Sequence, residues 1–177
     1  MAHALLRLHI GDRKTYGILC RDMVMSLHET ELPAGLLSEI LWVCCLGPGA
    51  VADYEPLIEL ADRMLTTIPK EADAEVRQRR TVILAALLYR DGRTGDASDR
   101  LRAAIRLAGG GYSASLCAFL AMAHHHQGDA AEARKFLAEM KRLEADSVGL
   151  AFLARLPQYH LCREAEQVIG AAIPGDR

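Results

Sequence analysis

Three consecutive histidines, at positions 124–126, stand one residue before a Gly-Asp pair, and metal binding is the chemistry that such a cluster first suggests. A helical zinc site places its ligands at i and i+3 or i+4, because only those spacings bring two imidazoles to one helix face. Consecutive helical residues instead point about 100° apart. The nearest carboxylates, Asp129 and Glu132, follow the turn. We therefore expect neither a metal site nor a cofactor.

Patterns for covalent catalysis are also missing from the sequence. It contains no G-x-S-x-G nucleophile elbow, and its serines and cysteines fall in apolar runs or turns. The cysteines are odd in number and form no C-x-x-C pair. We expect a protein that is not an enzyme and that lies in the cytoplasm with reduced, buried thiols at Cys20, Cys44, Cys45, Cys117 and Cys162.

The elements that position the histidines belong to a repeat. Residues 114–143 align without a gap on residues 78–107, at an offset of 36 residues, so that Gly128 falls on Gly92. Each unit has the apolar periodicity of a helix, then a tight turn, then a second helix. The small residues Ala121 and Ala133 stand where the two helices of a hairpin would cross closely.

The turn before the last of these helices has its own signals. Gly128 supplies a left-handed backbone position that ends the preceding helix. Asp129, with Glu132 three residues later, resembles a capping box. Similar turns at Gly11, Asp53 and Gly92 mark the other units.

This pattern of small residues resembles the tetratricopeptide repeat (TPR), which carries Leu-Ala in its first helix, Gly-Asp-like turns and Ala with a large apolar residue in its second. The resemblance implies an all-α fold in one domain over residues 1–177. That fold would be a right-handed α-solenoid of about four helix-turn-helix hairpins, with a C-terminal capping helix interrupted at Pro157. The approximate repeats are 1–27, 34–67, 72–107 and 113–143, and the capping segment is 148–172.

A more specific resemblance lies in "LWVCCLGPGAVADYEPLIELADRML", "AALLYRDGRTGDASDRLRAAIRLAGGG", "FLAMAHHHQGDAAEARKFL" and "REAE". These segments are similar to the C-terminal repeat region of planctomycete-type bacterial serine/threonine kinases and sigma-factor-like proteins. The chain has no kinase Gly-rich loop, H-R-D or D-F-G run. The resemblance therefore implies a scaffold or adaptor for protein–protein interaction in bacterial signalling or regulation. A self-assembling subunit of a larger complex is the alternative.

Charge narrows the choice of partner. The net charge of −2 over 177 residues gives no general attraction to nucleic acid or membranes. The "VRQRR" run spreads around a helix without interleaved aromatics, and the longest uncharged apolar run is broken by Gly-Pro-Gly. Locally, residues 76–107 hold eight arginines against three aspartates, whereas residues 39–64 hold five acidic residues against one arginine. This contrast favours docking between neighbouring repeats, and it would attract an acidic protein or peptide.

The repeat alignment selects the candidate binding residues. Positions 125 and 126 correspond to positions 89 and 90 of the previous unit, near the groove-facing side of the first helix, whereas His124 takes a packing position. An arginine fork grips carboxylates, an aromatic ring stacks, and histidines would make binding pH-dependent. The alternatives are a packed tyrosine and solvated helix ends. The candidate partner-binding residues are Arg79, Tyr89, Arg90, His125 and His126.

Overall fold

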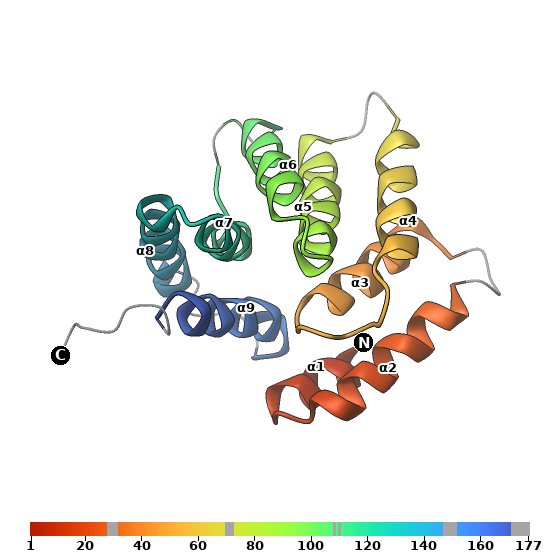
Figure 1. Ribbon diagram of the computed structural model, residues 1–177. Coiled ribbons are helices and arrows are strands. Elements are labelled where there is room, and N and C mark those ends of the chain that lie inside the picture. The colour runs from red at the N-terminus through yellow and green to blue at the C-terminus, as the bar shows by residue number, and fades with distance from the viewer. Residues whose placement is uncertain (28–31, 70–72, 108, 110, 147–151, 171–177) are drawn as a thin grey trace.

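The computed structural model describes residues 1–27, 32–69, 73–107, 109, 111–146 and 152–170, with only the backbone for 152–154 (Figure 1). Within these residues the fold contains nine helices and no strand, which confirms the all-α prediction. The helices are α1 (Ala2–His9), α2 (Arg13–Ser26), α3 (Ala34–Cys45), α4 (Glu55–Thr66), α5 (Ala74–Arg90), α6 (Thr94–Leu107), α7 (Ala114–His126), α8 (Ala130–Asp146) and α9 (Phe152–Gly170).

The two aligned segments form the two tightest helix pairs, α5 with α6 and α7 with α8. Alanines allow this close approach, because a small side chain lets two helix backbones come near each other. Ala85 and Ala97 are fully buried in the first pair, and Ala121 and Ala133 are fully buried in the second. The closely packed helix pairs thus coincide with the 36-residue repeat.

The same turn recurs at the ends of α1, α5 and α7. Gly11, Gly92 and Gly128 have φ values of 79°, 84° and 80°, a left-handed conformation that favours glycine. In each turn the residue after the glycine donates its N–H across the turn at 2.9 Å, as Asp129 does to the carbonyl of His124. This is the Schellman pattern, and it brings the following helix back against the previous one.

The predicted capping box at Asp129 and Glu132 is only half formed. The Oδ1 atom of Asp129 accepts a hydrogen bond from the Glu132 N–H at 3.2 Å, as an N-cap should. The Glu132 carboxylate instead accepts from Lys135 Nζ at 3.0 Å. The side chain of Glu132 therefore joins an ion pair on the helix surface.

The N-terminal helices pack differently. α3 and α4 make few contacts with each other, and α4 packs mainly on α5. The loop between them is held by Tyr16, whose hydroxyl donates to the Val43 carbonyl at 2.6 Å and accepts from the Gly47 N–H at 3.1 Å. A β-carbon on Gly47 would lie 2.9 Å from both Leu8 Cδ1 and Tyr16 Cε1, so this close approach requires glycine.

The oppositely charged segments of the sequence meet in the fold. Arg93 pairs with Glu55 at 3.5 Å and Arg100 pairs with Asp62 at 3.9 Å, so both pairs join α4 to the α5–α6 hairpin or its turn. All four side chains are largely exposed, and such pairs stabilise a fold only slightly. Their contribution to stability is therefore small.

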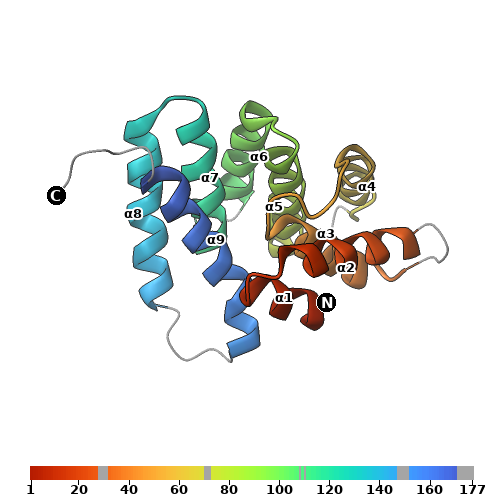
Figure 2. The same cartoon turned by 60° about the horizontal axis from the view of Figure 1, so that its bottom comes forward.

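The terminal helix α9 lies inside the arc that the other helices form, with α7 and α8 on one side and α1 on the other (Figures 1 and 2). His9 of α1 contacts both Tyr159 and His160 of α9, with ring centroids 5.8 Å and 5.5 Å apart. The helix continues through Pro157, so the predicted interruption there is wrong. Packing on α7 holds the segment helical despite the missing proline N–H.

Helix α7 is apolar on every side. Its residues from Leu116 to His124 are all buried, because α5, α6, α8 and α9 all contact it. No helix in the described part of the chain has both the length and the apolar character needed to span a bilayer.

Candidate partner-binding site

The site is built on the face where α3, α5 and α7 lie next to one another. Helix α5 supplies Arg79 near its beginning and Arg90 at its end. Eleven residues are about three helical turns, so the two arginines project from the same face of α5, about 16 Å apart along its axis. Each arginine lines a different cavity.

The cavity at Arg90, here called the terminal-helix cavity, has a volume of about 610 Å³. Helix α9 forms one wall of it, and the loop after α3 forms another. Its lining includes three of the candidate binding residues, together with side chains from α2 and α9: Tyr89, Arg90, His126, Arg13, Glu164 and Gln167.

Arg90 is fixed by two elements. Its Nε–H donates to the Cys45 carbonyl of α3 at 2.7 Å, and both terminal nitrogens donate to the Glu164 carboxylate of α9, one of them at 2.6 Å. The arginine side chain is 3% exposed and the glutamate side chain 17%. Burial alone would lower the pKa of Arg90, but Glu164 keeps it above the ordinary value. The arginine thus grips a carboxylate, and that carboxylate belongs to the chain itself.

Tyr89 is buried beside this pair. Its ring lies edge-on to Phe119 of α7 at 5.6 Å, and its hydroxyl hydrogen-bonds to His126 Nε2 at 3.1 Å. Burial, followed by the charge of Glu164, raises the pKa of Tyr89 to about 12. The tyrosine therefore packs between neighbouring hairpins while its neutral hydroxyl reaches the cavity. His125 is half-buried, contacts the His126 ring at 5.8 Å, and lines neither cavity.

The cavity at Arg79, here called the tryptophan pocket, has a volume of about 390 Å³. Trp42 of α3 and Tyr112 contribute aromatic rings to its lining, and Val82 contributes apolar surface. Arg79 pairs with Glu39 across its edge, and both side chains are open to water, at 58% and 43% exposure. Gln78, Ser113 and Ser115 add hydrogen-bonding groups. The charged residues of the lining are Arg79 and Glu75, so the aromatic walls match an apolar side chain and Arg79 is the group that could pair with a carboxylate.

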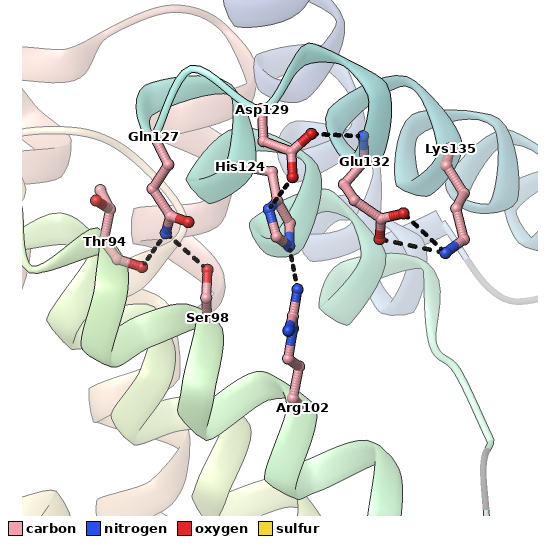
Figure 3. A network of polar contacts seen from close by, with 8 residues as sticks. All are labelled: Thr94, Ser98, Arg102, His124, Gln127, Asp129, Glu132 and Lys135. Atoms are coloured by element: carbon pink, nitrogen blue, oxygen red, sulfur yellow. Dashed lines mark hydrogen bonds and ion pairs between the residues drawn. The ribbon is translucent and has the colours of Figure 1, made fainter.

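His124 has a structural role, as the sequence indicates. Figure 3 shows it between α6 and α8, with Nε2 accepting from Arg102 at 3.3 Å and Nδ1 lying 3.6 Å from an Asp129 carboxylate oxygen. Its ring stacks on Phe136 at 5.7 Å. Burial lowers the pKa of His124, and the positive charge of Arg102 lowers it further. Because an arginine side chain only donates, Nε2 is the acceptor in the contact with Arg102.

The same interface carries a second polar contact. Gln127 at the end of α7 donates to the Thr94 carbonyl at 2.8 Å and to Ser98 Oγ at 2.9 Å (Figure 3). The α5–α6 and α7–α8 hairpins are thus joined by directional bonds as well as by apolar packing.

Cysteines and histidines are the residue types from which a metal site or a nucleophile could be built. Among the residues that the structure describes, no group of three His, Cys, Asp or Glu side chains could hold a metal ion. All five cysteines are free and buried. Burial raises the pKa of Cys117 and of Cys162 to about 12, so both sulfurs stay protonated near neutral pH.

The structure therefore divides the candidate set. It brings Tyr89, Arg90 and His126 together at the terminal-helix cavity and places Arg79 in the tryptophan pocket. Sequence reasoning missed Glu164, because the apolar period of a terminal helix does not show where that helix packs. It also missed Tyr112 as a pocket residue, although an exposed aromatic beside a glycine run is a usable signal.

No protein-family model matches the chain, and neither a curated protein nor a solved structure matches it significantly. The class of protein that the fold and the site define is thus an all-α protein with two cavities on one shared helical face.

Proposed function

We propose that the chain is a non-catalytic scaffold or adaptor that binds an acidic peptide, helix or neighbouring domain on the face of α3, α5 and α7. The fold would be a right-handed TPR-like α-solenoid. The 36-residue repeat and the recurring glycine turns support that assignment. The resemblance to bacterial repeat regions supports a role in signalling or regulation, and the five free, buried thiols support a cytoplasmic location.

The observation that carries this proposal is the tryptophan pocket. A concave site with aromatic walls and a few placed polar groups is the usual form of a binding site. Arg79 offers a partner its guanidinium there, because the exposed pair with Glu39 is weak and exchanges readily with another carboxylate. A partner segment with an apolar anchor and an acidic residue would fill the pocket and replace Glu39.

The test is direct binding. A peptide selected from a library of acidic sequences is titrated into the protein, and the fluorescence of Trp42, the sole tryptophan, reports occupancy. We expect Arg79→Ala to weaken binding by about tenfold or more, since charged hydrogen bonds contribute about 1.5–3 kcal/mol. The matched control is Arg134→Ala, because Arg134 is exposed on α8, which does not line the pocket. Equal affinities for both variants would contradict the proposal.

Self-assembly is a second function that one observation favours. Leu6 in α1 and Ile10 directly after that helix are large apolar residues with side chains open to water, at 41% and 67% exposure, and together they offer a small apolar patch. If this patch joins two copies, light scattering should give a multiple of the chain mass, and Ile10→Glu should reduce it to one chain. A mass of one chain at high concentration would exclude this function.

A further inference from the structure

Helix α9 occupies the face on which we place the partner. It lies within the arc, against α7, and reaches α1 on the other side (Figures 1 and 2). A helix that only caps the last hairpin would have no contact with α1 or with Arg90 at the end of α5. This path divides the binding face into a covered end at the terminal-helix cavity and an open end at the tryptophan pocket.

The covered end is preorganised to receive a carboxylate. Arg90 is held by the Cys45 carbonyl of α3, a contact that does not involve α9. The body of the arc therefore aims the guanidinium fork toward the position where Glu164 binds. Arg90 is 3% exposed with α9 in place, and any partner helix that buries it again must supply a counter-charge, because a buried arginine without one is strongly unfavourable.

The rest of the contact specifies the form of that ligand. Leu161, Ala165 and Ile169 are buried at i, i+4 and i+8, and Glu164 stands three residues after the first of them. This is the pattern by which an amphipathic helix binds in a groove. Helix α7 has apolar residues on every side and needs such a cover. Because the terminal-helix cavity opens beside Glu164, water has access to the edge of the ion pair.

We propose that α9 is a displaceable internal ligand, which closes one end of the binding face until an amphipathic helix of a partner, with a glutamate at the place of Glu164, replaces it. This inference rests on the proposed function only in taking the face of α3, α5 and α7 as the binding surface. The chain thus has a closed state, with α9 bound, and an open state that a partner helix stabilises.

Hydrogen exchange on the full chain tests the closed state without any partner. The wild type is measured at several urea concentrations below its unfolding transition. The amides of α9 should then exchange through a local opening of that helix, while the amides of α5 to α8 stay protected. Glu164→Gln should speed α9 exchange by about tenfold or more, because it removes the charge partner of buried Arg90. Glu166→Gln is the matched control, since Glu166 pairs with Lys141 of α8 and with Arg163 at the surface, where ion pairs contribute little, and it should speed exchange only a few-fold at most.

A labelled peptide of residues 152–170 then tests replacement. The peptide with Glu164 should bind the Glu164→Gln chain, as measured by fluorescence anisotropy, and should bind the wild type at least tenfold more weakly. The same peptide with Glu164→Gln should bind neither chain.

Exchange of α9 in step with α7 and α8 at every urea concentration, in the wild type, would overturn the proposal and make α9 a fixed part of the core. Lack of peptide binding to the Glu164→Gln chain would also overturn it. Neither readout uses the tryptophan pocket or an external partner. Failure here is therefore distinguishable from failure of Arg79→Ala to weaken peptide binding.

Discussion

Arg79 and Arg90 stand on the same face of α5, about three turns apart, and have opposite environments. The Arg79 side chain is 58% exposed and pairs with an exposed glutamate, whereas the Arg90 side chain is 3% exposed and grips Glu164 in bidentate form. The difference arises from the terminal helix, which covers one end of the face and leaves the other open (Figure 1).

This contrast shows how one face of a single helix acquires two roles. A surface arginine in water forms ion pairs that contribute little to stability, so its carboxylate partner can change. A buried arginine depends on its partner, because an unpaired charge in the interior is strongly unfavourable. The open end of the face is therefore suited to ready exchange of ligands, whereas a ligand at the covered end is released only when another carboxylate takes its place.

The largest expected effect tests this contrast directly. Arg90→Ala should lower the free energy of unfolding by about 3–5 kcal/mol, because it leaves the Glu164 carboxylate without its charge partner in a mostly buried position. Arg79→Ala, its matched control, should lower it by less than about 1 kcal/mol. Urea denaturation followed by circular dichroism measures both. Equal losses would show that the two ends of the face do not differ as described.

The next effect concerns the loop that forms a wall of the covered end. Gly47→Ala should lower the free energy of unfolding by about 1–3 kcal/mol, because its β-carbon would lie 2.9 Å from Leu8 and Tyr16 side-chain atoms. Gly35→Ala in α3 meets no atom within 4 Å and should instead stabilise by about 0.5–1 kcal/mol. Urea denaturation measures both variants, and their midpoints should shift in opposite directions from that of the wild type. A neutral Gly47→Ala would mean that the loop adapts freely.

The sequence is sufficient to predict the helices and their tight pairs. Gly128 and Gly92 end helices because their left-handed conformation suits glycine, and Ala121 and Ala133 permit close packing. These are local signals, since each depends on a few neighbouring residues. The packing position of His124 was also predictable, because the repeat alignment places it on a core position.

The candidate site was predictable only in part, because its environment depends on a distant helix. The chemistry of Arg90 indicated carboxylate binding, but nothing near it in sequence shows that Glu164, 74 residues later, is the partner. The apolar stripe of α9 shows that one side of this helix must be buried, but it does not show against which other helices. The continuous helix through Pro157 has the same cause, because tertiary contacts override the local effect of the proline.

Acidification should weaken the covered end at its contact with α1. Burial, followed by the adjacent His9, lowers the pKa of His160 below its ordinary value of 6.5. The unfolded chain then binds more protons, so this contribution to stability is complete above about pH 6.5 and is lost as the pH falls toward the folded pKa. His160→Gln should flatten the fall in unfolding free energy between about pH 7 and 5.5, whereas His3→Gln should not. An unchanged slope in His160→Gln would contradict this.

The smallest expected effect separates the two remaining histidines. His126→Ala removes the hydrogen bond to the Tyr89 hydroxyl and should lower the free energy of unfolding by about 0.5–1.5 kcal/mol. The lower half of that range is expected, because His126 is exposed and water in the cavity can replace the imidazole. His125→Ala removes only a ring contact at 5.8 Å and should change stability by less than about 0.5 kcal/mol. Thermal denaturation measures both changes. Affinity for a partner is a separate test of the two histidines. If the chain that carries both His125→Ala and His126→Ala binds a selected peptide as tightly as the wild type does, neither histidine contacts the partner. Recognition at the open end then depends on Arg79 and the aromatic walls of the tryptophan pocket.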